Sequence, residues 1–161
     1  MRHDGDFTAY AEARWPTLVR TLVLLGSPLS EAVEVAERTL AGCLLNWHAL
    51  REAGDIDVEV YAELLHERSR ALEQDPQPVS GVPVTDPDPD RSDAAMLLEA
   101  LGDALDRLEP ADRCAVVLRH GAGLSAVQVA EALHVDQVEV EGRLARGLAE
   151  LDAARLVQRC R

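Results

Sequence analysis

Lysine is absent from this chain, so all 16 basic residues are arginines, and they stand against 29 acidic residues. The formal net charge is −13 at pH 7. A protein that binds nucleic acid on its own normally presents a basic surface, because neutralising phosphates and releasing counterions supplies much of the affinity. The acidity therefore argues against strong autonomous DNA binding, although a module that a larger partner delivers to DNA escapes this requirement.

Aromatic residues are scarce as well. They make up only 3% of the chain, whereas 47% of the residues are hydrophobic, mostly alanine, leucine and valine. No segment shows a convincing period-two alternation of apolar and polar residues, which a half-buried strand would need. Composition therefore predicts an all-α protein with an aliphatic core.

Long apolar runs are also missing. The best run, residues 18–26, is interrupted by Arg20 and is far shorter than the ~20 residues that a membrane span needs. The N-terminal sequence MRHDGDFTAYAEARW contains acids and lacks the apolar core of a signal peptide. We therefore expect a soluble, cytoplasmic protein with no membrane partner.

Residue patterns that carry chemistry are absent too. Cys43, Cys114 and Cys160 are far apart and outside any CxxC spacing, as expected for free thiols in a reducing compartment. No two histidines have the i, i+4 spacing of a helical metal site, and neither a Gly-rich phosphate loop nor a nucleophile elbow occurs. We expect no metal site, no cofactor and no catalytic residue, and hence no enzyme.

Three helices are expected before the composition changes. Apolar residues at spacings of three and four predict helices over about Phe7–Leu25, Ser30–Arg51 and Val58–Gln74. Pro16 lies inside the first pattern and should kink or break that helix, because proline has no N–H donor and crowds the preceding turn. The acids of the third helix, among them Glu67, are expected on a solvated face.

The stretch DPQPVSGVPVTDPDPDRSD then contains five of the eight prolines and almost no side chain that could pack in a core. It cannot form a helix and is interpreted as a flexible linker over 76–93. Two small helical domains follow from this, over 1–75 and 94–161. The first carries 7 arginines and 14 acids and the second carries 8 and 11, so the C-terminal domain is the less acidic one.

The C-terminal domain should contain a helix over about Ala94–Leu108, another that starts at Pro110, and then a helix pair. In the final stretch, LSAVQVAEALHVDQVEVEGRLARGLAEL, Ser125 is the expected N-cap of the first helix and Asp136 of the second. Val140, Leu144, Leu148 and Leu151 form the apolar stripe of the second helix. The short link fits a helix-turn-helix, and on spacing alone an ordinary antiparallel helix pair is the alternative.

The order of elements resembles the extracytoplasmic-function group of bacterial sigma-70 factors, especially the actinobacterial type. The segment LDRLEPADRCAVVLRHGAGLSAVQVAEALHV is similar to the C-terminal domain of that family, whose next helix usually reads S.GTVKSRLSRGLARLR. Here DQVEVEGRLARGLAEL follows in register, with matches between Arg143 and Leu148. A weaker likeness covers ARWPTLVRTLVLLGSP and the later NW, so the resemblance extends over most of the chain outside the linker.

This resemblance implies a region 2-like domain over 1–75 that binds the polymerase clamp and opens the −10 element. It also implies a region 4-like domain over 94–161 that reads the −35 element in the major groove. Core RNA polymerase, promoter DNA and an anti-sigma factor are the implied partners. Glu34 and Glu37 would face the polymerase. The residues that would face DNA are Gln137, Glu139, Glu141, Arg143 and Arg146.

Two of these residues depart from the family pattern. Glu141 stands where the family commonly has lysine, and Glu139 adds a second acid, so −35 binding should be weakened by repulsion from phosphate. An acid accepting from cytosine N4 is a minor alternative. The third helix, EVYAELLHERSRALEQ, lacks the basic and aromatic run that the family uses for melting. The alternative function is therefore a degenerate sigma-like protein that occupies an anti-sigma factor or another regulator without binding promoters.

His134 is a third departure, because the family usually has glycine in this turn. A positive φ at a histidine would be mildly strained. We interpret this histidine as sequence drift rather than as a ligand.

Overall fold

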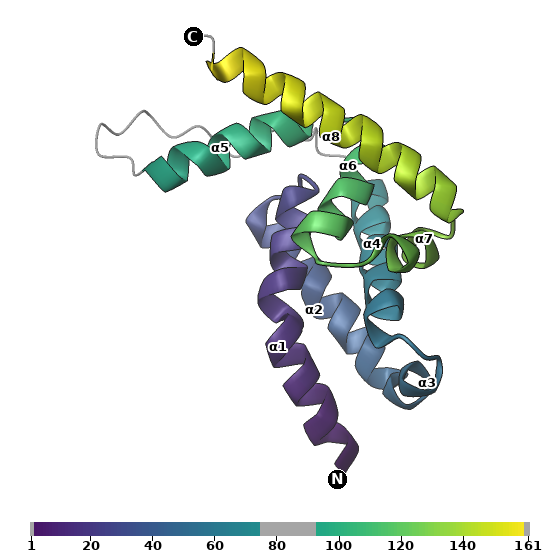
Figure 1. Cartoon of the computed structure of the whole chain (residues 1–161). Helices are drawn as coiled ribbons and strands as arrows, with labels where there is room; N and C mark the ends of the chain where they lie inside the picture. Colours follow the sequence, from purple (N-terminus) through teal and green to yellow (C-terminus); the bar gives the residue numbers. More distant parts are fainter. Residues whose placement is uncertain (1, 75–92, 160–161) are drawn as a thin grey trace.

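The computed structural model describes residues 2–74 and 93–159, and these residues form helices without any strand (Figure 1). The first part of the chain contains α1 (Arg2–Leu24), α2 (Leu29–Leu45), α3 (Trp47–Glu52) and α4 (Ile56–Gln74). The second part contains α5 (Asp93–Asp106), α6 (Pro110–Val116), the π-helical turn η1 (Val117–Gly121), α7 (Ala126–Leu133) and α8 (Gln137–Arg159). The all-α prediction is confirmed. The predicted linker lies outside the described residues except for Asp93, where α5 begins.

Pro16 does not interrupt α1, which runs continuously from Arg2 to Leu24. A proline inside a helix costs about 3 kcal/mol. Leu18 and Leu22 follow it within two turns and are completely buried, so the apolar area that the continuous helix buries outweighs this cost. The predicted break is therefore wrong.

The second predicted helix is in fact two helices, divided at Asn46. Asn46 has φ −112° and ψ 15°, outside the helical region, and its side-chain Nδ2 donates to the Gly42 carbonyl (3.4 Å). Asparagine offers its side chain to nearby backbone groups and so competes with helical hydrogen bonding. The turn brings the buried Trp47 against Phe7 and Tyr10, with ring centroids 5.2 and 5.3 Å apart.

Glu67 also differs from the expectation of a solvated acid. Its side chain is buried in α4 and accepts from Arg38 Nε (3.2 Å) and Arg70 Nη1 (2.8 Å). A buried carboxylate needs such partners, because desolvation without them costs several kcal/mol. This pairing holds α2 against α4.

One apolar core is shared by both parts of the chain. Helices α1, α2 and α4 surround it from the N-terminal side, and α6, η1, α7 and α8 close it from the other side. Members without any exposed surface come from both parts: Leu18, Leu22, Val35, Leu64, Ala115, Leu118, Val129 and Val140. A smaller cluster joins Leu25 of the first part to Leu105, Leu108, Val116 and Val117 of the second.

Arginine side chains connect the two parts at the C-terminal end of α1. Arg113 Nε donates to the Leu24 carbonyl (2.8 Å), and Arg20 of α1 donates to the Gly121 carbonyl (2.9 Å). Cations at the last carbonyls of a helix satisfy acceptors that have no partner within the helix. The two predicted domains thus lie against each other, and their boundaries at 75 and 94 stay a prediction.

The π-helical turn η1 shapes this contact. Ala122 N–H donates to the Val117 carbonyl (3.0 Å), five residues back, which widens the turn. Gly121 then lies so close to α1 that a Cβ atom there would be 3.2 Å from Leu24 Cδ1. A larger residue at this position would require the Leu24 side chain to shift.

Candidate nucleic-acid interface

Helix α7 begins with a reciprocal cap. The Ser125 hydroxyl accepts from Gln128 N–H (3.1 Å), and Gln128 Oε1 accepts from Ser125 N–H (2.8 Å). This capping box satisfies two amides that have no partner inside the helix. The predicted N-cap at Ser125 is confirmed.

The turn between α7 and α8 contains His134 in the left-handed region, with φ 54° and ψ 43°. Val135 N–H donates to the Ala130 carbonyl (3.0 Å) and His134 N–H to the Glu131 carbonyl (3.2 Å), which closes α7. His134 thus takes the left-handed conformation that the family's usual glycine would adopt with less strain. The tight turn makes α7 and α8 cross steeply (Figure 1), as a helix-turn-helix requires and an antiparallel pair does not.

Helix α8 rests on α6 and α7 through a face that Val140, Leu144 and Gly147 share. Val140 is fully buried, and a Cβ atom at Gly147 would lie 2.6 Å from Val116 Cγ2. Because α8 approaches α6 most closely at Gly147, the contact between the two helices is centred there. Leu148 lies beside this contact and is 41% exposed to solvent. The predicted stripe is therefore wrong at Leu148.

The residues predicted to face DNA lie on two flanks of α8. Gln137 and Glu141 share one flank, where Gln137 Nε2 donates to Glu141 Oε1 (2.9 Å). Glu139 and Arg143 share the other flank and form an ion pair through Arg143 Nη2. Gln137, Glu139 and Glu141 are exposed, whereas the Arg143 side chain is only 16% exposed.

Arg146 lies on the same flank as Arg143 but pairs with a residue of α6. Its Nε and Nη2 donate to the two carboxylate oxygens of Asp112 (3.1 and 2.8 Å). Asp112 is buried, whereas the Arg146 side chain is 63% exposed. These hydrogen bonds from Arg146 to Asp112 raise the pKa of the Arg146 guanidinium. The sequence analysis missed Asp112, because nothing near it in the sequence marks a partner 34 residues away.

Both arginines among the five predicted residues are therefore held by carboxylates of the protein. A guanidinium that already forms an ion pair with a carboxylate contributes little net positive charge toward a phosphate. Glu139 and Glu141 add negative charge on the two flanks. The geometry of a helix-turn-helix is present, and the charges on α8 oppose tight binding of phosphates by this helix alone.

The predicted polymerase-facing residues, Glu34 and Glu37, lie on α2. Both side chains are exposed. They are three positions apart in the sequence, so they share one side of the helix. They belong to the other part of the chain from α8 (Figure 1). Their role in binding polymerase stays a prediction.

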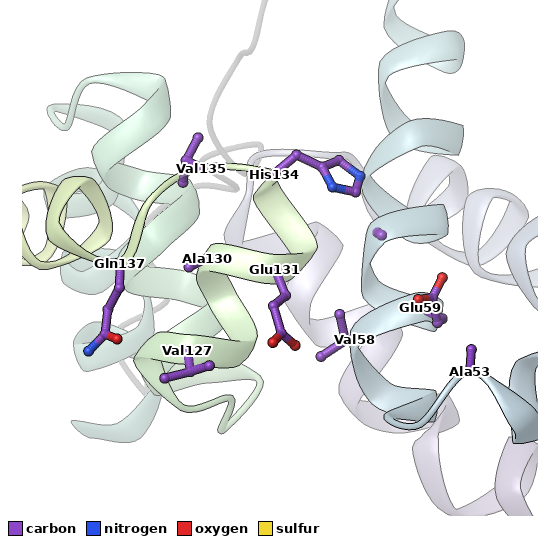
Figure 2. A pocket seen from close by; sticks show the side chains of 10 residues that line it. Ala53, Val58, Glu59, Val127, Ala130, Glu131, His134, Val135 and Gln137 are labelled. Carbon is purple, nitrogen blue, oxygen red and sulfur yellow. The ribbon is translucent and has the colours of Figure 1, made fainter.

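A groove of about 550 Å³ separates α4 from α7 (Figure 2). Val58 and Glu59 lie on its α4 side, and Val127 and Glu131 on its α7 side, while His134 extends from the turn toward α4. The walls combine apolar side chains with polar ones, and one acid lies on each side. The groove therefore lies at the junction of the two parts of the chain.

The described thiols and acids do not form a chemical site. Burial raises the pKa of both Cys43 and Cys114 to about 11, so both thiols stay protonated at neutral pH. Within residues 2–74 and 93–159, no cluster of side chains could hold a metal ion, and no helix is long and apolar enough to cross a membrane.

Comparison with known families agrees with this geometry. Residues 98–151 match the family model of sigma-70 region 4. That segment includes α6, η1, α7 and the first four turns of α8, which are the elements that build the helix-turn-helix.

Three relatives are similar to this chain over 91% or more of its length, well beyond the region 4 segment. The RNA polymerase sigma-E factor of Streptomyces coelicolor is 27% identical over 152 residues, which cover 91% of this chain and 84% of that protein. The sigma factor RpoE, in a co-crystal structure with the anti-sigma factor NepR from Bartonella quintana, is similar at a TM-score of 0.74 and 18% identity, covering 94% of this chain and 98% of the other. CnrH in complex with the cytosolic domain of CnrY gives a TM-score of 0.71 at 20% identity, covering 91% and 85%. The two structures show that the fold is shared.

Proposed function

We propose that this protein is a sigma factor of the extracytoplasmic-function type, which binds core RNA polymerase and directs it to promoters. The observation that carries this proposal is the helix-turn-helix of α7 and α8 inside a segment that matches sigma-70 region 4. In this function α8 enters the major groove at the −35 element. The Streptomyces relative supports an actinobacterial type, and the protein would act in the cytoplasm, where polymerase is found.

The N-terminal part would supply the polymerase contact and the action at the −10 element. The likeness to the Streptomyces sigma-E factor covers 91% of the chain and so includes most of α1 to α4. Glu34 and Glu37 are exposed on α2 and available to a basic polymerase surface. Because the DNA-facing arginines are already paired, we expect polymerase to supply most of the affinity for the promoter.

Transcription by a reconstituted holoenzyme tests this proposal. Purified protein plus core polymerase should initiate at discrete sites on fragmented genomic DNA, whereas core polymerase alone should not. The double variant Glu34→Lys/Glu37→Lys should weaken polymerase binding, and Glu12→Lys on α1 is the control for added positive charge. Absence of initiation at any site, together with no salt-sensitive DNA binding, would reject the function.

The paired arginines favour a second candidate. With Arg143 held by Glu139 and Arg146 held by Asp112, the outer face of α8 is acidic rather than basic. We propose as the alternative a sigma-like protein that binds an anti-sigma factor or another regulator and does not engage promoters. Both solved relatives named above are complexes, one of them with an anti-sigma factor. Capture of a regulator together with failed initiation would support this candidate, and failure of both assays would exclude it.

A further inference from the structure

A second pocket lies between α2 and α4, in the N-terminal part of the chain. Its volume is about 260 Å³, several times the ~30 Å³ that one water molecule occupies in the liquid. Six residues line it: Arg38 and Ala41 of α2, and Glu67, Arg70, Ala71 and Gln74 of α4. We call it the Glu67 pocket. The groove between α4 and α7 described above shares none of these residues.

The buried Glu67 carboxylate orients two guanidinium groups at this pocket. Its Oε2 accepts from Arg38 Nε and its Oε1 accepts from Arg70 Nη1, so each oxygen holds one arginine. The Glu67 side chain is only 11% exposed, whereas those of Arg38 and Arg70 are 46% and 55% exposed. Both guanidinium groups therefore reach solvent from a fixed anchor. Groups that are ordered before a ligand arrives lose less entropy when it binds.

The lining carries more positive charge than its internal pairing requires. Two arginines and one glutamate give a formal charge of +1, in a chain whose net charge is −13. Arg38 alone connects α2 to α4 through Glu67, because Arg70 lies three positions from Glu67 on the same helix. Arg70 therefore adds charge to the pocket without adding a link between the helices.

Exposed acids close in sequence to these arginines do not line the pocket. Glu34 and Glu37 lie on α2 before Arg38, and Glu73 follows Arg70 on α4. Solvent screens the charges of such exposed side chains more than it screens the charges inside a recess. The +1 charge of the lining is therefore felt most strongly by an anion that enters the pocket.

The arginines also keep hydrogen-bond donors to spare. Nη1 and Nη2 of Arg38 and Nε and Nη2 of Arg70 have no hydrogen-bond partner among residues 2–74 and 93–159. Gln74 adds a side-chain amide to the lining, and the small side chains of Ala41 and Ala71 leave the space open. Guanidinium groups form strong, often bidentate hydrogen bonds with phosphate oxygens. The pocket thus has the charge and the donors that an oxygen-rich anion needs.

We propose that the Glu67 pocket binds a phosphate monoester, which Arg38 and Arg70 hold while Glu67 keeps the two arginines in position. A terminal phosphate offers three free oxygens to the three side chains with donors, whereas a phosphodiester within a nucleic acid offers two. The ligand would join α2 to α4 and so stabilise the folded chain. This inference goes beyond the proposed function and does not depend on promoter binding.

Isothermal titration calorimetry of the full chain with inorganic phosphate tests the site, with sodium chloride at equal ionic strength as the blank. Arg70→Gln removes the surplus charge but leaves the Arg38–Glu67 link, so we expect phosphate to bind about tenfold or more weakly. Arg51→Gln is the matched control. Arg51 is 43% exposed and pairs with Asp6 outside the pocket, so this variant should bind phosphate like the wild type.

Ala41→Leu tests the recess without changing any charge. Ala41 is exposed and leucine is a good helix former, so the variant should fold, which circular dichroism checks. The larger side chain fills the space beside the arginines, and phosphate should bind severalfold more weakly. Ala49→Leu makes the same change at an exposed position of α3 and should leave binding unchanged.

A short oligothymidylate with or without a 5′-phosphate distinguishes a monoester from a nucleic acid backbone. We expect only the phosphorylated form to compete with inorganic phosphate, and only when Arg70 is present. Competition by both forms would overturn the monoester in favour of the backbone. Phosphate binding that is absent, or equal in the wild type and Arg70→Gln, rejects the site. Loss in Arg70→Gln with full binding in Ala41→Leu places the phosphate outside the recess and rejects the pocket.

Discussion

Glu141 is the residue of α8 whose charge is expected to matter most for DNA binding. It is exposed on one flank of the helix and accepts a hydrogen bond from Gln137. Glu141→Lys would replace repulsion from a phosphate by a contact. We expect affinity for promoter DNA to rise severalfold and the salt dependence of log K to steepen by about one phosphate contact, as measured by fluorescence anisotropy between 50 and 200 mM salt.

The same charge change on α1 is the control for Glu141→Lys. Glu12→Lys alters the net charge equally on an exposed side chain of the other part of the chain. It should leave the salt dependence nearly unchanged. Equal slopes for both variants would mean that this flank of α8 does not face DNA.

We expect the effects of substituting Arg146 and Asp112 on the free energy of unfolding to be coupled. Arg146→Ala leaves the buried Asp112 carboxylate without its two charged hydrogen bonds, so the free energy of unfolding should fall, by less than for a fully buried pair because Arg146 is largely exposed. Arg146→Ala/Asp112→Ala removes the stranded charge and should recover part of the loss. Urea unfolding of the wild type, Arg146→Ala, Asp112→Ala and the double variant gives the coupling, and additive effects would show that the pair does not act together.

At the scale of elements, Gly147 decides how closely α8 approaches α6. A methyl group at this position would lie 2.6 Å from Val116 Cγ2, so Gly147→Ala forces the helices apart. We expect a loss of about 1–3 kcal/mol in the free energy of unfolding and a weaker DNA complex, because α8 moves relative to α7.

Gly102 provides the matched control on another helix. Nothing lies within 4 Å of a Cβ atom there, and the position is inside α5. Gly102→Ala should therefore stabilise by about 0.5–1 kcal/mol through helix propensity alone. Thermal unfolding of both variants separates the steric effect from the propensity effect, and stabilisation by Gly147→Ala would contradict the close contact.

At the scale of the whole molecule, the shared core should make the two parts unfold together. Leu118 of η1 is completely buried among residues of both parts, so Leu118→Ala should cost about 2–5 kcal/mol. Both tryptophans lie in the first part of the chain, whereas far-ultraviolet circular dichroism reports on every helix. The two signals should give one coincident transition that this substitution shifts to lower urea concentration.

An exposed leucine supplies the comparison for Leu118→Ala. Leu45 is 85% exposed at the end of α2, so Leu45→Ala should change stability by less than about 0.5 kcal/mol. A tryptophan signal that does not respond to Leu118→Ala would show that the two parts unfold independently.

Local patterns in the sequence were sufficient for most of the helices. The capping signal at Ser125 and the apolar spacing of α7 and α8 depend on residues within a few turns of one another, so a helix pair with a short link could be predicted. The choice of a helix-turn-helix and of the DNA-facing residues followed from the resemblance to the sigma-70 family between Arg143 and Leu148. Pro16, Asn46 and Leu148 were misjudged, because burial, a side-chain hydrogen bond and the contact at Gly147 each override a local rule.

The sequence by itself determined an acidic all-α chain with a short-linked helix pair near its end, because helix periodicity and capping act over short distances. Only the tertiary structure decided that Arg146 forms an ion pair with Asp112, that Gln128 donates a hydrogen bond to Asp55, and that both parts of the chain share one core. These contacts join residues 34 and 73 positions apart, and their partners are ordinary surface-type residues in the sequence. The physical reason is that a charged side chain pairs with the residues that the fold packs against it. A local sequence pattern does not show which residues these are.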